Sequence, residues 1–150
     1  MNPAARLYMI YQETELIDEI KSLLKEKSVL YEAVKLIGKI PHEDMMYWYS
    51  AADFYISGSH KEGSGYSLLE AMACGCPVIC SNTSSIPEVV GDAAELFDPH
   101  DLESAERALQ GIAKDADRAI LITNGITRAS RFSDRIMARR TVELYKTLDD

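Results

Sequence analysis

The sequence lacks an excess of positive charge. Its 150 residues include 16 Lys and Arg against 24 Asp and Glu, which gives a formal net charge of −8. Nucleic acids and anionic lipid surfaces are held largely by clustered basic side chains. We therefore expect no nucleic-acid partner, and any phosphate that the chain binds must meet a locally built site.

Long apolar runs are also missing. A helix that spans a bilayer needs about 20 consecutive apolar residues, and no uninterrupted run approaches that length. The first six residues, Met1 to Arg6, have no apolar core of the kind found in a secretory leader. We expect a soluble, cytoplasmic chain, in which any peripheral membrane contact would come through parts absent from this sequence.

Cysteine is scarce and badly spaced for disulfides. Cys74, Cys76 and Cys80 are odd in number and lie within seven residues, whereas a disulfide framework needs an even count and wider spacing. The C-x-C-x3-C pattern could in principle bind zinc, but no His lies nearby, and the residues flank a helix end and a buried strand. We expect free thiols and neither a metal nor any other cofactor.

The hydrophobic pattern alternates between strands and helices along the whole chain. A composition of 47% hydrophobic and 27% charged residues suits one globular domain of this length. Apolar runs predict strands at 7–11, 34–37, 53–57, 77–80 and 94–97, and helical periodicity predicts helices at 13–27, 43–49, 66–74, 101–113, 116–129 and 133–148. This order predicts an α/β fold, with a parallel sheet, right-handed crossovers and helices on both faces. Ligands of such sheets bind beyond the carboxyl ends of the strands.

The segment from Ser57 to Ile79 carries the strongest chemical signal. Gly63 and Gly65 allow the backbone to approach a ligand closely, and the helix that follows offers unpaired N–H groups to an anion such as a diphosphate. Glu62 and Glu70 lie before and within that helix, so their carboxylates should be about 10 Å apart. The carboxylate pair of a retaining glycosidase is only about 5 Å apart, which disfavours a hydrolase.

Joined to its neighbours, this segment resembles a known family. The Glu62-x7-Glu70 pattern runs directly into Ala71-Met72-Ala73-Cys74-Gly75-Cys76-Pro77-Val78-Ile79, and further matches are 36–40, 49–53 and 86–90. The chain resembles the C-terminal, donor-binding domain of the retaining GT-B glycosyltransferases of group one. This implies a Rossmann-like domain at 1–150, part of a two-domain enzyme. The N-terminal acceptor domain, the first strand and helix, and the basic diphosphate clamp would then lie outside this chain.

The resemblance also implies a function. Such enzymes transfer a hexose from a nucleoside-diphosphate sugar to a glycan or lipid-linked acceptor, as in polysaccharide biosynthesis, with no agreed protein nucleophile. UDP-, GDP- and ADP-sugars are all open as donors. The isolated chain is expected to be inactive because it lacks the acceptor domain.

Residue roles follow from the same resemblance. Glu62, the catalytic candidate, would lie beside the transferred sugar, and Glu70 would bind the ribose hydroxyls. The other donor-binding candidates are the backbone of Gly63, Ser64, Gly65 and Tyr66 for the sugar hydroxyls, the N–H groups of Ser67 and Leu68 for the diphosphate, and Gly38, Lys39 and Ile40 for the base. Two departures stand out: Ser64 replaces a common aromatic residue, and Tyr11-Gln12 replaces a glycine-rich turn.

Other interpretations stay open. The chain could be a non-catalytic module for binding sugar nucleotides or for assembly, or belong to a nucleotide-sugar epimerase of the same architecture. Glu70 could be an ordinary exposed helix residue, and Glu62 could act only through its charge at a helix N-terminus. His42 and His60 are expected in loops or caps, and Tyr49 in helix packing. The arginines near the last helix are expected to form a solvated face: Arg128, Arg131, Arg135, Arg139 and Arg140.

Overall fold

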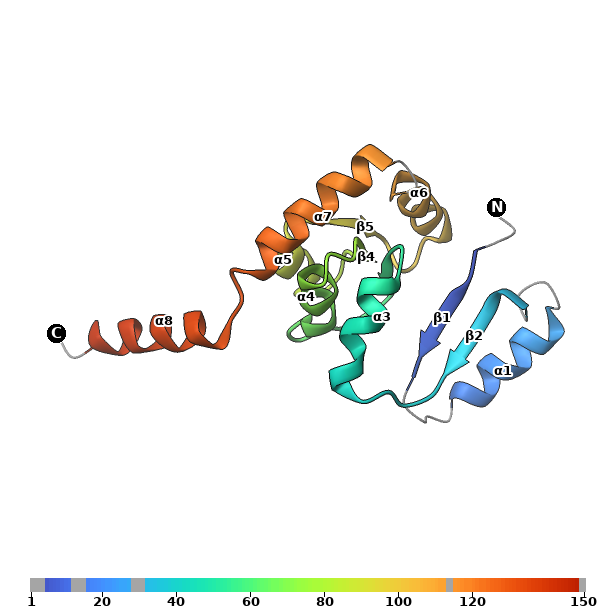
Figure 1. Ribbon diagram of the computed structural model, residues 1–150, viewed down its shortest axis with the longest axis horizontal. Helices are drawn as coiled ribbons and strands as arrows, with labels where there is room; N and C mark the ends of the chain where they lie inside the picture. The colour runs from blue at the N-terminus through green and yellow to red at the C-terminus, as the bar shows by residue number, and fades with distance from the viewer. Residues whose placement is uncertain (1–4, 12–15, 28–31, 113–114, 149–150) are drawn as a thin grey trace. The chain divides into compact units, whose positions relative to one another are not determined.

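The computed structural model describes residues 5–11, 16–27, 32–112 and 115–148 (Figure 1). Contacts within the chain group it into two compact units, Met1–Met45 and Met46–Asp150. That the two act as one donor-binding domain stays a prediction.

The first unit is a strand, helix, strand arrangement. Strand β1 (Leu7–Ile10) pairs in parallel with β2 (Val34–Ile37), with Leu7 opposite Val34 and Ile10 opposite Ile37. Helix α1 (Leu16–Glu26) connects them and buries Ile17. The predicted helix start at Glu13, and Gln12 of the expected turn, lie outside the described residues. A single 3-10 turn, η1 (His42–Asp44), follows Pro41.

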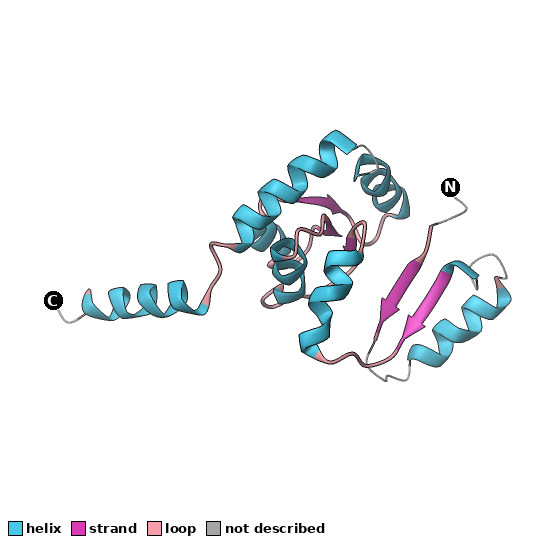
Figure 2. Cartoon of the chain, viewed as in Figure 1, coloured by secondary structure: helices cyan, strands magenta, loops and turns pink. Residues whose placement is uncertain are grey.

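The second unit contains a three-stranded parallel sheet in the order β3-β4-β5 (Figure 2). Its strands are β3 (Tyr55–Ser57), β4 (Val78–Ser81) and β5 (Ala94–Phe97). The central strand, β4, is buried at all four positions. Around and after the sheet come α3 (Met45–Ala51), α4 (Tyr66–Ala73), α5 (Ile86–Val90), α6 (Leu102–Ile112), α7 (Asp115–Ala129) and α8 (Asp134–Lys146).

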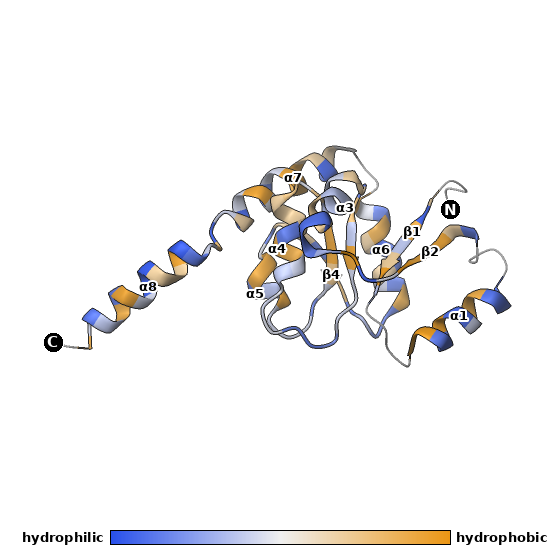
Figure 3. Cartoon of the chain, turned by 60° about the horizontal axis from the view of Figure 1, so that its bottom comes forward, coloured by the Kyte–Doolittle hydropathy of each residue, from blue (hydrophilic) through white to orange (hydrophobic). Residues whose placement is uncertain are grey.

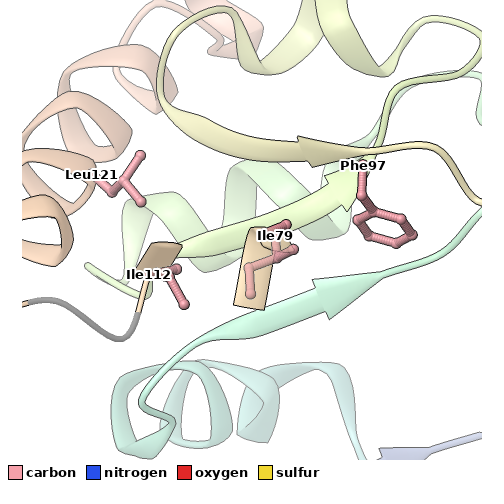
Figure 4. Close-up of a cluster of buried hydrophobic side chains, with 5 residues drawn as sticks. Ile79, Phe97, Ile112 and Leu121 are labelled. Carbon is pink, nitrogen blue, oxygen red and sulfur yellow. The ribbon is translucent and has the colours of Figure 1, made fainter. Parts of the chain in front are cut away.

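A buried apolar cluster joins this sheet to two helices. Figure 4 shows Ile79 of β4 beside Ile112 of α6 and Leu121 of α7, with Phe97 at the end of β5. Ala108 completes the cluster one helical turn before Ile112. Full burial of such a side chain stabilises the fold by about 1.5–3 kcal/mol. Helix α6 thus contributes to the core through Ala108 and Ile112.

Helix α4 ends in a backbone motif that directs the chain into β4. The N–H of Cys76 donates to the carbonyl of Ala71 at 2.9 Å, and the N–H of Gly75 donates to that of Met72 at 3.0 Å. This paired arrangement is a Schellman motif, which requires a left-handed residue after the helix. Gly75 supplies it with a φ of 73°, directly after the helix predicted at 66–74.

The α/β fold with parallel strands and helices on both sides is confirmed, with two differences in detail. The strands form two separate sheets, β1-β2 and β3-β4-β5, where the alternation had suggested one. Helix α5 was not predicted, because five residues beginning Ile86-Pro87 are too few to show a period. In the described part of the chain, no helix is both long enough and apolar enough to cross a membrane.

Candidate functional site

The loop between β3 and α4 has a conformation that only glycine fits well. Gly65 caps the N-terminus of α4 with a φ of 62° and is buried. A Cβ at this position would lie 3.1 Å from Cγ1 of Val89. Gly65 is therefore required both by the left-handed backbone and by its close packing against α5.

Glu62 closes this loop upon itself. Its Oε1 accepts a hydrogen bond from the N–H of Gly65 at 3.1 Å, and its side chain is half-buried. The carboxylate thus lies at the start of α4, where the helix dipole favours negative charge. This contact matches the structural alternative considered for Glu62, while its catalytic role stays a prediction. It also occupies the Gly65 N–H that was expected to hold a sugar hydroxyl.

The first turn of α4 keeps two backbone donors open. The N–H groups of Leu68 and Leu69 both donate to the carbonyl of Gly65, at 3.1 and 3.2 Å. Among the described residues, no hydrogen bond takes the N–H of Tyr66 or Ser67. These two groups, at the positive end of the helix, can meet an anion. The Leu68 N–H, expected to face a diphosphate, is engaged within the helix.

Glu70 is held by a tyrosine from α3. The Tyr49 hydroxyl lies 3.4 Å from Oε2 of Glu70 and donates to it. Tyr49 is buried and packs edge-on against Tyr55, with 5.4 Å between ring centroids. Burial raises the pKa of Tyr49 far above its usual value, and Tyr55 and the negative charge of Glu70 raise it further. Tyr49 therefore stays protonated and keeps its donor at any physiological pH.

Tyr49 is thus more than the packing residue that the sequence suggested. Its ring packs as expected, but its hydroxyl orients the half-buried Glu70 carboxylate. Glu70 is accordingly not an ordinary solvated helix residue. The pairing spans 21 residues, and the only sequence signal for it was a tyrosine, rather than a phenylalanine, on the inward face of α3.

A set of hydroxyl groups after β4 fastens the glycine-bearing loop. We call Ser81, Thr83, Ser84 and Ser85 the hydroxyl latch. Ser81 and Thr83 both donate to the carbonyl of Ser59, at 2.5 and 3.0 Å. Ser84 and Ser85 both donate to the carbonyl of Glu62, at 2.9 and 2.7 Å, and Ser85 also lies 3.1 Å from the carbonyl oxygen of Gly63.

The hydroxyl latch was missed because its partners are distant in sequence. The segment around Asn82-Thr83-Ser84 was interpreted only as a loop, and its bonds reach back 22 to 24 residues. The available signal was the run of four hydroxyl residues among the five at 81–85. They follow a buried strand whose carboxyl end lies at the ligand-binding edge of a parallel sheet.

The remaining predicted site residues lie in the first unit. Gly38 and Lys39 are exposed, and Ile40 is half-buried, directly after the carboxyl end of β2. The predicted site residues from Glu62 to Glu70 all lie in the second unit, whereas Gly38, Lys39 and Ile40 lie in the first. Their role at the base of a nucleotide stays a prediction.

Two histidines meet at the loops beyond β3 and β5. The ring centroids of His60 and His100 are 4.8 Å apart, and both residues are exposed. No group of three or more His, Cys, Asp or Glu side chains suited to a metal occurs among the residues that the structure describes. The absence of a metal from the chemistry stays a prediction.

The three thiols are free. Cys76 and Cys80 are buried, and burial raises their pKa values to about 11 and about 12, respectively. Both thiols are therefore protonated, and poor nucleophiles, at neutral pH.

Arg128 corrects the expectation of a solvated arginine face. Its Nε donates to the carbonyl of Val89 at 2.8 Å, and its Nη2 donates to that of Glu88. Its guanidinium lies over the Phe132 ring, 5.1 Å from the centroid. Because the last carbonyls of a helix lack partners within it, a half-buried cation is favoured there. Arg128 thus fastens α7 to the end of α5.

The sequence matches the family model of group 1 glycosyl transferases over residues 11–128. That match covers most of the chain, including both glutamates and the loop between them. The chain belongs to the group 1 glycosyltransferases. The predicted resemblance is thereby confirmed.

Relatives and solved structures agree with this assignment. The O-antigen chain mannosyltransferase B of Escherichia coli is 38% identical over 132 residues, covering 87% of this chain and 35% of the relative. Sucrose-phosphate synthase from Thermosynechococcus elongatus is similar with a TM-score of 0.83 and 29% identity, covering 95% of this chain and 38% of that one. Anabaena HepE, solved with UDP and glucose, has a TM-score of 0.77 and 20% identity, covering 95% and 40%, respectively. The chain thus spans about a third of the length of the E. coli relative.

Proposed function

We propose that this chain is the donor-binding part of a hexosyltransferase that uses a nucleoside-diphosphate sugar. The observation that carries the proposal is the joint geometry of the loop and helix: Glu62 at the bend, open N–H groups on Tyr66 and Ser67, and Glu70 held by Tyr49. A diphosphate at the helix start would place the transferred sugar toward Glu62 and the ribose toward Glu70.

Mannose is the proposed sugar. A mannosyltransferase that builds an O-antigen chain is 38% identical to this chain, which supports a mannosyl donor and a growing polysaccharide as acceptor. HepE, which has the same fold, binds UDP and glucose, so the fold also accommodates a uridine donor. The nucleotide is therefore to be settled by titration with several donors.

The proposed reaction retains the configuration of the sugar. The acceptor oxygen forms a bond to the anomeric carbon on the face from which the diphosphate leaves, the anomeric C–O bond to the diphosphate breaks, and the acceptor proton passes to a diphosphate oxygen. Fixed donors aimed at the leaving group stabilise its developing charge. In this chain the N–H groups of Tyr66 and Ser67 would supply part of that stabilisation.

Titration calorimetry with GDP-mannose, UDP-glucose and ADP-glucose tests the proposal. We expect one of these donors to bind, and Glu70→Ala to weaken its binding by about 10- to 100-fold, as expected for a lost hydrogen bond to a charged group. Glu106→Ala, at an exposed glutamate of α6, is the control and should leave binding unchanged. Tight binding that Glu70→Ala does not affect would contradict the assignment.

The transfer reaction needs a second test. The chain should transfer no sugar by itself and become active when joined to an acceptor domain, because it spans only about a third of the E. coli mannosyltransferase. Donor binding without transfer in the joined protein would instead favour a non-catalytic binding module. Isomerised sugar nucleotide formed without any acceptor would favour an epimerase.

A further inference from the structure

The hydroxyl group of Ser85 lies in an unusual position for a helix-capping residue. Ser85 is the N-cap of α5, where a serine side chain ordinarily accepts a hydrogen bond from the first turn of its own helix. It makes no such bond. Its hydroxyl lies 2.7 Å from the carbonyl oxygen of Glu62 and 3.1 Å from that of Gly63. The side chain is thus turned away from its own helix and toward the loop that carries the site.

Ser84 departs from local preference in a second way. Its φ is 56°, and it is the one non-glycine residue with a positive φ in the described part of the chain. Such a backbone suits glycine, yet a hydroxyl stands here and donates to the carbonyl of Glu62 at 2.9 Å. Departures from local rules concentrate at functional sites. Ser84 and Ser85 both depart from local preference, and the hydroxyl groups of both donate to the carbonyl of Glu62. This arrangement points to a role for that carbonyl.

These bonds fix the direction of two backbone donors. In a planar trans peptide the N–H points opposite to the C=O of the same unit. Because the carbonyls of Glu62 and Gly63 both point at Ser85, the N–H groups of Gly63 and Ser64 point away from the hydroxyl latch. Gly63 and Ser64 are exposed, and no hydrogen bond in the described residues takes either N–H. A carbonyl oxygen has two lone pairs, and that of Glu62 uses both on the two serines.

We propose that Ser84 and Ser85 are positioning residues for the donor: they hold the Glu62 and Gly63 peptide groups so that the N–H groups of Gly63 and Ser64 face the bound sugar. This proposal rests on the proposed function. Fixed donors bind a ligand better than mobile ones because less ordering is needed when the ligand arrives. The serines act through the backbone and themselves touch no ligand.

The experiment compares two ligands on the full chain. Calorimetry is performed with the best binder among GDP-mannose, UDP-glucose and ADP-glucose, and with the matching nucleoside monophosphate, which lacks the sugar and one phosphate. In Ser84→Gly/Ser85→Ala, binding of the sugar nucleotide should weaken about tenfold, while that of the monophosphate should be unchanged. Ser85→Thr keeps the hydroxyl and should bind as the unmodified chain does.

Two further variants serve as controls. Ser130→Ala removes a serine hydroxyl that lies directly after α7 and donates to the carbonyl of Thr127, and should change neither affinity. Ser85→Ala alone provides the comparison should the double variant fail to fold. If the double variant binds the sugar nucleotide normally, or loses affinity equally for both ligands, the positioning role is wrong while the proposed function stands. If the unmodified chain binds none of the three donors, the proposed function fails, and the positioning role with it.

Discussion

At the scale of single residues, the loop conformation depends on which positions can adopt a left-handed backbone. Ser84 does so with a side chain, at a φ of 56°, whereas Gly65 does so at 62° without one. The left-handed region costs an L-residue about 1–2 kcal/mol. At both positions, glycine should therefore be more stable than alanine.

Ser84→Gly should be more stable than Ser84→Ala by about 1 kcal/mol. Both substitutions remove the same hydroxyl, so the lost bond to Glu62 cancels in the comparison. Glycine relieves the left-handed backbone, and this gain exceeds its own entropic cost of about 0.5–1 kcal/mol. Urea denaturation of the two variants measures the difference. Equal stability, or the reverse order, would show that the backbone at Ser84 is not strained.

Gly65→Ala should destabilise the chain by about 1–3 kcal/mol, from the left-handed backbone and from crowding against Val89. It should also weaken donor binding, because the N-terminus of α4 must shift. Gly63→Ala is the matched control, since a Cβ there meets nothing within 4 Å and the φ is not left-handed. Thermal denaturation of both variants tests this, and a similar loss in each would contradict the proposed basis.

At the scale of elements, the site is made by contacts between the segments that follow neighbouring strands. The sequence predicted the loop, the helix start at Tyr66 and the stop at Gly75, because local chemistry determines these features. It did not predict α5 or the hydroxyl latch. Helix α5 is too short to show a helical period, and the hydrogen bonds of the hydroxyl latch join residues more than 20 positions apart.

Arg128→Ala should destabilise the chain by about 1.5–3 kcal/mol. The arginine donates to the last carbonyls of α5 from α7, and hydrogen bonds from a charged donor contribute about this much. Arg128→Lys should recover only part of the loss, because an ammonium lacks the forked geometry of the guanidinium. Urea denaturation provides the measurement.

The control for this substitution is Arg131→Ala. Arg131 is exposed, and surface substitutions of this kind change stability by no more than about 0.5 kcal/mol. If Arg128→Ala were as mild as Arg131→Ala, the original expectation of a solvated arginine face would be restored. The sequence could not distinguish the two arginines, because the contacts of Arg128 with α5 depend on how the helices pack in the folded chain.

At the scale of the whole molecule, α8 contributes little to the described core. None of its residues is buried, and Met137, Leu144 and Tyr145 are each at least 60% exposed. Apolar and polar residues alternate along it (Figure 3). By contrast, α7 buries Leu121 in the core cluster and packs Gly125 against Met72 of α4. The amphipathic pattern predicted both helices equally well and could not tell which one packs.

Removal of every residue after Phe132 should therefore change the free energy of unfolding by less than about 1 kcal/mol, because so little apolar area leaves a buried environment. The cut keeps Phe132, whose ring contacts Arg128. A longer cut that removes every residue after position 114 should abolish cooperative unfolding, since it takes Leu121 from the core. Denaturant unfolding followed by circular dichroism compares the three lengths. A large loss from the shorter cut would mean that α8 packs against the rest of the chain in solution, and its apolar face would then belong to the fold.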